Sequence, residues 1–308
     1  MRSRDLVEVS LLSAISAVLF LSSVFIPVVG VAVAFFCPVP IVILGMKHGF
    51  RRGLTGTVVA SIIVGLLSGP FQALWMFMGF GFVGLGIGVL VAMGKSAIEV
   101  LIYGSMISLS SKVVLVLLSL ALFGVNPFSI DIKQMEHALT SALSVAGSSV
   151  DVKLLVSRWL TIMQIAVPAI FLLASIIDTF LAYIVSYKVL KKMHISMPQL
   201  LPFELWALPR SMFWGFVAGI LFAWMGRGDV GNLWYRIGIN VQIVFSIAFM
   251  IYGMSILYFW LKKVKMPKVV AWIIVVVTVL QPFLSQLLVF LGIFDLWVDF
   301  RKIRKGAG

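Results

Sequence analysis

The chain has 308 residues, of which 62% are hydrophobic and only 11% are charged. A soluble domain has about 25% charged residues, so this chain carries too few to cover a water-facing surface. The net charge of +13 would suit a nucleic-acid-binding protein, but the Lys and Arg residues fall in short clusters between long apolar stretches. Composition therefore predicts an all-α, polytopic membrane protein in the lipid bilayer, with no nucleic-acid partner.

The first two-thirds of the chain alternate between apolar runs and short breaks. Residues 9–46 and 53–94 contain no charged side chain, and about 20 apolar residues are enough to cross a bilayer as a helix. The first apolar run is longer than that of a signal peptide, so we expect it to be retained as a helix. The pattern predicts a transmembrane helical bundle of about eight spans, at about 6–27, 30–46, 53–69, 71–94, 97–124, 158–188, 209–227 and 235–262. The second and third spans are short, so one of them is a candidate re-entrant segment.

The loop between the fifth and sixth spans is the longest polar segment. Within it, Met135, Leu139 and Leu143 recur at helical spacing. This pattern predicts an amphipathic helix on the outer membrane surface, which either caps a cavity or only connects the two spans.

The C-terminal apolar segment, about 269–298, contains Gln281-Pro282 near its middle. Proline removes a backbone donor and bends a helix. A single crossing would also place the basic residues of the tail, beginning with Arg301 and Lys302, on the outer side. We therefore expect a shallow, Pro-broken hairpin, about 269–281 and 284–298, with a single crossing as the alternative.

The basic residues also predict the orientation, because cytoplasmic loops are rich in Lys and Arg. If the N-terminus is inside, the basic residues between spans or at their ends that fall outside are only five: Lys133, Lys153, Arg158, Arg227 and Arg236. The sequence thus predicts a multi-pass protein of the inner (cell) membrane, with both termini cytoplasmic.

Two ionisable residues fall inside predicted spans, Lys112 in the fifth and Asp178 in the sixth. Such residues are costly in hydrocarbon and mark candidate functional sites. Three interpretations are open: a direct salt bridge, separate contacts with a ligand in a polar cavity, or structural burial. The predicted span boundaries place the two residues about 10 Å apart in depth, which disfavours direct pairing. We add Gln72 and Gln164 as further candidates for substrate binding, although amides inside bundles often serve only to join helices.

Residues that suit catalysis or metal binding do not cluster in the sequence. His48, His137 and His194 are far apart in loops, and no nucleotide-binding, serine-hydrolase or zinc-protease motif occurs. The lone Cys37 is most simply a small apolar residue. We therefore expect no enzyme activity, no cofactor and no metal.

Small residues recur at four-residue spacing in the first span, where Ser10, Ser13, Ala14 and Ala17 form one face. Such a face lets another backbone approach closely. It either packs within the chain or docks a helix of a partner.

The end of the chain, LVFLGIFDLWVDFRKIRK, resembles the closing pattern of the YybS-like family of polytopic bacterial membrane proteins. The matching residues are Gly292, Asp295, Asp299, Phe300, Arg301 and Lys302. The start, SLLSAISAVLFLSSVFIPVVG followed by CPVPIVILGMKHGFRRGLTGTVVASIIVGLLSGP, resembles the S components of energy-coupling-factor vitamin transporters, with a looser form of their glycine turn at Phe50–Gly53.

The S-component resemblance implies a six-helix membrane domain over residues 1–190, followed by additional helices over 191–308. It also implies that the small-residue face of the first helix docks a transmembrane coupling subunit driven by ATPases. The protein would then bind a small molecule for transport. Alternatively, the chain is a non-transporting membrane scaffold or regulator that acts through helix–helix contacts.

Overall fold

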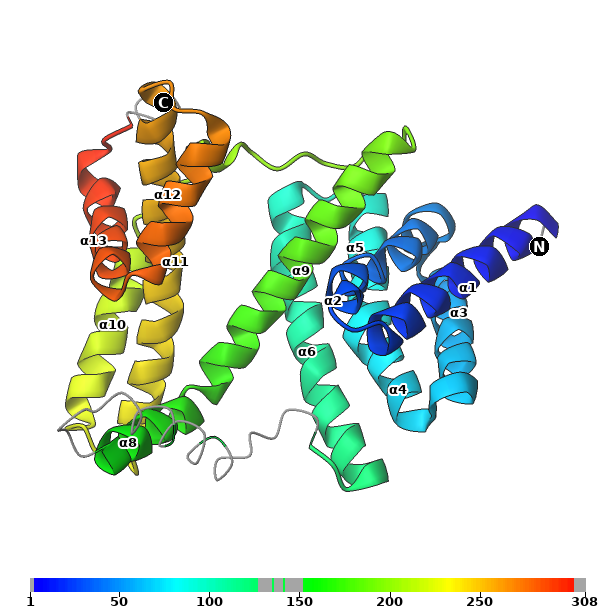
Figure 1. Ribbon diagram of the computed structural model, residues 1–308, viewed down its shortest axis with the longest axis horizontal. Coiled ribbons are helices and arrows are strands. Elements are labelled where there is room, and N and C mark those ends of the chain that lie inside the picture. Colours follow the sequence, from blue (N-terminus) through cyan, green and yellow to red (C-terminus); the bar gives the residue numbers. More distant parts are fainter. Residues whose placement is uncertain (1–2, 127–134, 136–140, 142–151, 302–308) are drawn as a thin grey trace. The chain divides into compact units, whose positions relative to one another are not determined.

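The computed structural model describes residues 3–126, 135, 141 and 152–301, and all regular structure in these ranges is helical (Figure 1). The predicted amphipathic helix near residue 139 falls outside them, apart from Met135 and Ser141. The chain forms two compact units. Unit 1 consists of residues 1–131 and 171–200, and unit 2 of residues 132–170 and 201–308. The division predicted at residue 190 lies near the boundary at 200, but residues 132–170 belong to unit 2.

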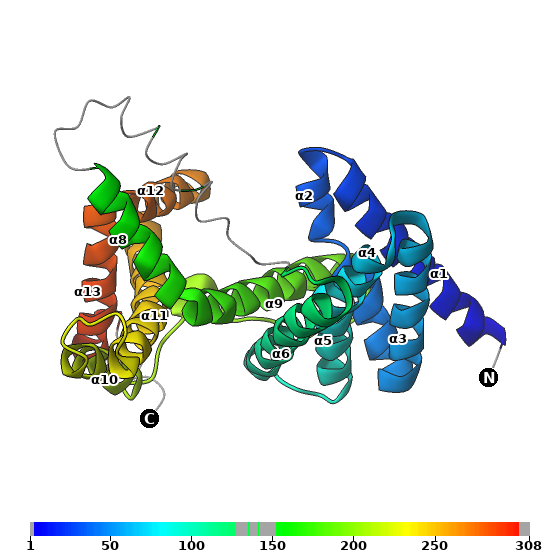
Figure 2. The same ribbon diagram turned by 90° about the horizontal axis from the view of Figure 1, so that it is seen from below.

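Unit 1 is organised around α3, which packs against α1 and α5 (Figure 2). Its elements are α1 (Ser3–Phe25), α2 (Val29–Ala34), α3 (Pro38–Ser68), α4 (Pro70–Trp75), the π-helical turn η1 (Met76–Gly81), α5 (Phe82–Ala92), α6 (Ala97–Phe123) and, from Phe171 onward, α9 (Val167–Lys192). The close packing of α3 and α5 depends on glycine, since a Cβ placed on Gly88 would lie 2.3 Å from the carbonyl oxygen of Val42.

The chain reverses direction inside α3, at Gly49. This residue has a φ of 73° and a ψ of −176°, a conformation that glycine adopts readily and other residues do not. A Cβ placed on Gly53 would lie 3.4 Å from the Cα of Gly45, whereas eight residues of straight helix span about 12 Å. The two arms of α3 are therefore antiparallel, as expected for the second and third spans, but the first arm, from Pro38 to His48, is shorter than the span expected at 30–46.

Unit 2 is organised around α11, which packs against α10, α12 and α13. Its elements are α8 (Val152–Ile165), the 3₁₀ turn η2 (Phe203–Leu205), α10 (Met212–Met225), α11 (Leu233–Lys263), α12 (Lys268–Leu280) and α13 (Pro282–Val298). Two glycines bring α11 and α13 together. A Cβ placed on Gly253 would lie 2.0 Å from the carbonyl oxygen of Leu288, and one on Gly292 would lie 2.3 Å from that of Phe249.

The break predicted at Gln281-Pro282 is present, and the axes of α12 and α13 differ there by 105°. Gln281 is extended and Pro282 begins α13. The chain thus turns through more than a right angle instead of crossing along one axis.

Two predicted spans are wrong in detail, because proline divides them. The span at 30–46 consists of α2 and the start of α3, separated just before Pro38. The span at 158–188 consists of α8 and α9, separated at Ala166, and α9 continues to Lys192. Pro168 has no N–H to continue the helical hydrogen bonds across this break.

The all-α membrane fold is confirmed, with fewer spans than the eight expected. Within the described ranges, 6 helices are long and apolar enough to cross a membrane, or up to 7 if the bent pair α12–α13 counts as one span. The difference arises because residues Val29–Ser68 count as one segment and because α10 is shorter than a full span.

Candidate functional site

Lys112 of α6 and Asp178 of α9 form an ion pair in unit 1. Lys112 Nζ lies 2.6 Å from Asp178 Oδ2 and donates a hydrogen bond of 2.7 Å to Ser108 Oγ. The side chain of Lys112 is 12% exposed and that of Asp178 is 50% exposed. Of the three arrangements compatible with the sequence, the structure therefore has the direct salt bridge, with its carboxylate still accessible.

The antiparallel register of α6 and α9 and the length of the lysine side chain explain why the two residues meet. Lys112 lies about 3 Å beyond the midpoint of α6, and Asp178 about 2 Å before the midpoint of α9. The two helices run in opposite directions, since Gly104 contacts Thr179 and Val100 shares a core cluster with Tyr183. These contacts place the Cα of Lys112 level with residue 171, about seven residues or 10 Å along α9 from Asp178. The expected offset is therefore present, and the Lys112 side chain bridges it by lying back along α6, where its Nζ also reaches Ser108.

A cavity of about 280 Å³ opens beside this ion pair. Lys112 and Asp178 line it together with apolar and aromatic residues, including Phe35, Trp75 and Phe80. We call it the Lys112–Asp178 cavity. An apolar pocket with a few convergent polar groups is the usual form of a small-molecule site.

The helices that carry the ion pair pack through small hydroxyl residues. The buried faces of the helices include Ser105, Ser108 and Ser111 on α6 and Ser175 and Thr179 on α9. Ser111 Oγ donates to the carbonyl of Met78 in η1, whereas the buried Thr179 Oγ1 has no hydrogen-bond partner among the described residues. The interior near Asp178 thus contains more polar groups than the contacts within unit 1 use.

The other residues predicted for this site lie elsewhere. Gln72 is in α4 and does not line the Lys112–Asp178 cavity. Gln164 is in α8, in unit 2, where it lines a different cavity. On the small-residue face of α1, Ser13 and Ala17 are buried within unit 1, while Ser10 and Ala14 are exposed.

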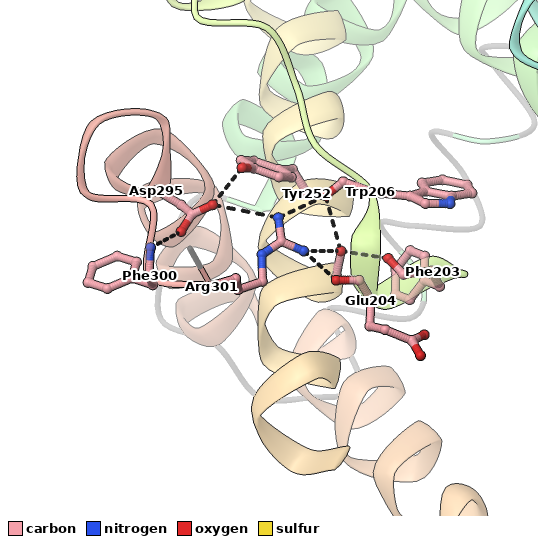
Figure 3. Close-up of polar contacts among 8 residues, drawn as sticks. Phe203, Glu204, Trp206, Tyr252, Asp295, Phe300 and Arg301 are labelled. Carbon is pink, nitrogen blue, oxygen red and sulfur yellow. Dashed lines mark hydrogen bonds and ion pairs between the residues drawn. The ribbon is translucent and has the colours of Figure 1, made fainter. Parts of the chain in front are cut away.

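A second group of charged residues lies in unit 2, where Arg301 and Asp295 are both 1% exposed. Arg301 Nη1 donates to the carbonyl of Glu204 (2.7 Å) and to Ser255 Oγ (2.8 Å), and Nη2 donates to the carbonyl of Trp206 (2.8 Å) (Figure 3). Arg301 Nη2 also lies 3.6 Å from Asp295 Oδ2. Because these contacts fix the backbone of 203–206, the arrangement joins the end of the chain to the segment before α10.

The carboxylate of Asp295 is equally well occupied. It accepts hydrogen bonds from Tyr252 Oη at 2.5 Å and from the Phe300 N–H at 2.7 Å (Figure 3). The guanidinium of Arg301 also lies 5.1 Å from the centre of the Tyr252 ring. We call Tyr252, Ser255, Asp295 and Arg301, with the carbonyls that they bind, the Arg301 cluster.

Sequence reasoning noticed Asp295 and Arg301 only as part of a family pattern. The structure gives that pattern a physical meaning, because Gly292 lets α13 approach α11 and Asp295, one turn later, reaches Tyr252 of α11. The αL conformation of Asp299, which ends α13, then directs Arg301 inward. The sequence feature that could have indicated this cluster is the pair of charged residues, Asp295 and Arg301, near the end of an apolar helix.

These features define the class of the protein. Long apolar helices, glycine-mediated helix packing and an ion pair near the midpoints of two spans are those of a polytopic helical membrane protein.

The chain belongs to the family of predicted membrane proteins DUF2232, whose model matches residues 14–296. It is similar to "Uncharacterized protein YybS" of Bacillus subtilis (strain 168), with 24% identity over 307 residues and 98% of each chain covered. The YybS-like resemblance is thereby confirmed. No solved structure matches the chain, so the likeness of the first six predicted spans to S components stays a prediction.

Proposed function

We propose that this membrane protein binds a small polar molecule in the Lys112–Asp178 cavity and takes part in its transport. The observation that carries the proposal is an ion pair at mid-span whose aspartate side chain is half exposed and is among the residues that line a cavity. An ion pair away from water gains little net stability, because desolvation offsets the attraction between the charges. Stability alone is therefore a weak reason for these two residues to be there.

The hydrogen-bond donor and acceptor that the pair leaves unused indicate the kind of ligand. Asp178 Oδ2 and Ser108 Oγ accept two of the three protons on Lys112 Nζ, and Asp178 Oδ1 has no partner among the described residues. The cavity therefore offers one charged donor and one charged acceptor side by side. A small zwitterion, or a neutral molecule with adjacent donor and acceptor groups, fits this chemistry.

The position of the site near the midpoints of two apolar helices supports a role in transport rather than in binding a ligand at the membrane surface. Secondary transporters hold substrates near the middle of the bilayer, so that either side can gain access by a movement of helices. The resemblance to S components supports a second element of the proposal, in which a transmembrane coupling subunit and ATPases supply the energy.

The test begins with full-length protein purified from native membranes in mild detergent. Small molecules released from it are identified by mass spectrometry and compared among the wild type, Lys112→Gln, Asp178→Asn and Lys95→Gln. Lys95 is the matched control, because it pairs with Glu99 at the start of the same helix, away from the cavity. We expect the two cavity variants to lose a released ligand that the wild type and the control retain.

The result that contradicts the proposal is a wild type that releases no ligand, or one whose ligand survives both cavity substitutions. Co-purification with and without cross-linking tests the coupling subunit separately. If the Ala14→Leu variant loses a co-purifying partner but keeps its ligand, the exposed part of the α1 face is the surface that docks this partner.

Cross-linked protein partners without any ligand would favour the scaffold alternative. One observation supports that function: Ser10 and Ala14 are exposed at four-residue spacing, a surface that allows close approach of another helix.

A further inference from the structure

A second cavity, of about 580 Å³, lies in unit 2 where α8 ends and α11 begins. Its polar lining comes from Thr161, Gln164, Arg236 and Asn240. Its apolar lining includes Ile165, Pro168 and Leu233. We call it the Arg236 cavity. It lies apart from the site proposed for transport, within a different compact unit.

Asn240 holds the walls of the Arg236 cavity together. At the break between α8 and α9, Asn240 Oδ1 accepts the Ala169 N–H at 2.8 Å and Asn240 Nδ2 donates to the Ile165 carbonyl at 2.7 Å. In an unbroken helix these two groups, four residues apart, would bond to each other. The side chain of Asn240 thus replaces a missing helical hydrogen bond and ties the break to α11, which gives the cavity a fixed shape.

Arg236 is oriented but not neutralised. Its Nε donates to the Val230 carbonyl at 2.8 Å, and no acidic residue in the described ranges forms an ion pair with it. The nearby Asp229 instead accepts the N–H of Gly231 at 2.9 Å. The two terminal nitrogens of Arg236 are therefore available for an anion, and a guanidinium fork suits the oxygens of a phosphate group.

The remaining lining fits a ligand with a polar head and an apolar body. The amide of Gln164 has no hydrogen-bond partner among the described residues and supplies a further donor beside Arg236. The α8 helix is itself amphipathic, with Val156 and Leu160 buried and Arg158 and Trp159 exposed. Helices of this kind lie in the headgroup region of a membrane.

We propose that the Arg236 cavity binds the phosphate ester group of an anionic amphiphile, with Arg236 and Gln164 on the phosphate oxygens and the apolar wall against the rest of the molecule. A phosphodiester of a membrane lipid and a free phosphate ester share this chemistry. The lipid is the source that the position of α8 favours.

The experiment uses full-length protein in detergent and native mass spectrometry. The protein is titrated with phosphatidylglycerol or phosphatidylcholine of the same acyl chains, and glycerol 3-phosphate is added in a separate arm. We expect the wild type to bind phosphatidylglycerol about tenfold more tightly than phosphatidylcholine. Both lipids carry a phosphodiester anion, but the trimethylammonium group of phosphatidylcholine offsets that charge and repels the Arg236 guanidinium beside it. Arg236→Gln should abolish the preference, whereas Arg236→Lys, which keeps the charge, should retain most of it.

Two further variants distinguish lipid binding in the Arg236 cavity from non-specific attraction to positive charge on the surface. Arg158→Gln removes another exposed charge, from α8 outside the cavity, and should leave the preference unchanged. Gln164→Ala should weaken phosphatidylglycerol binding without altering Arg236. If glycerol 3-phosphate displaces phosphatidylglycerol, the cavity is a phosphate site whose ligand is a free ester. If it does not, the cavity is a phosphate site whose ligand is a lipid. Equal binding of the two lipids by the wild type, or an equal loss in Arg158→Gln and Arg236→Gln, would overturn the proposal.

Discussion

The ion pairs Arg301–Asp295 of unit 2 and Lys112–Asp178 of unit 1 differ in how completely their hydrogen bonds are used. In unit 2, Arg301 and Asp295 bind each other, two side chains and three backbone groups. In unit 1, Lys112 and Asp178 bind each other and Ser108, and leave a donor and an acceptor toward a cavity. Apart from the buried Arg301 Nε, which has no hydrogen-bond partner among the described residues, the Arg301 cluster is saturated and holds its surroundings in place. The Lys112–Asp178 pair is unsaturated and can exchange partners with a ligand. This contrast leads us to assign a structural role to the first and binding to the second.

The largest effect should follow from removing one partner in the Arg301 cluster. Asp295→Ala leaves a buried guanidinium without its counter-charge and frees Tyr252, so we expect a loss of about 3–5 kcal/mol in the free energy of unfolding. Denaturation of the protein in micelles, followed by circular dichroism, measures it. The double variant Asp295→Leu with Arg301→Met should recover little, because the carbonyls of Glu204 and Trp206 lose their donor. Full recovery would mean that the pair alone, not the cluster, is important.

A smaller loss should follow from separating the two helices that form the cluster. Gly253→Ala places a methyl group against the carbonyl of Leu288, and overpacking of this kind costs about 1–3 kcal/mol. The same denaturation experiment applies, with Gly231→Ala in an exposed turn as the control. An unchanged stability in Gly253→Ala would show that α11 and α13 are not in close contact.

The corresponding double replacement in unit 1 should behave differently. Lys112→Met with Asp178→Leu removes both charges and leaves no bound backbone group without a partner. Its stability should therefore stay within about 1 kcal/mol of wild type or increase, while ligand release is lost. A destabilisation as large as that of Asp295→Ala would remove the distinction between the two pairs.

The smallest effect concerns pH and the surface pair next to the Arg301 cluster. Partial burial raises the pKa of Glu204, but the hydrogen bonds from Lys262 and from its own backbone outweigh this and hold the pKa below its ordinary value. A carboxylate with a lowered pKa in the folded state stabilises the protein above its ordinary pKa, and this contribution disappears as the pH falls through the lowered value. The stability difference between wild type and Glu204→Gln should hence be a few tenths of a kcal/mol at pH 7 and vanish once the pH is below the lowered pKa of Glu204. A difference that persists in acid would exclude this ion pair as its cause.

The sequence was sufficient for the parts of the fold that depend on local composition. Apolar length predicted α6 and α11 to within a few residues, and Pro282 marked the bend between α12 and α13. The break at Ala166 was missed because the hydropathy there continues without interruption. It was also missed because Asn240, from a distant helix, bonds the Ala169 N–H and the Ile165 carbonyl that the break separates.

The candidate site was predicted in its residues but not in its geometry. The cost of charge in hydrocarbon identified Lys112 and Asp178, whereas their contact depends on the packing of α6 against α9 and on the direction of the Lys112 side chain, which the sequence did not define. Gln72 and Gln164 have the same chemistry as groups that line binding sites, but only the packing of helices decides which cavity a side chain faces. The role of Arg301 depends on carbonyls 95 and 97 residues away in the chain, which no local pattern encodes.

The reversal at Gly49 has a consequence for how the protein enters the membrane. The arm that precedes it, from Pro38 to His48, is about 16 Å long, roughly half the thickness of the hydrocarbon core. It exposes little of its surface, because Ile41 and Leu44 are buried against neighbouring helices. Such an arm gains too little from lipid alone to insert by itself. During synthesis, the chain from α1 to the end of α3 should therefore leave the translocation channel as one preassembled hairpin, rather than one helix at a time.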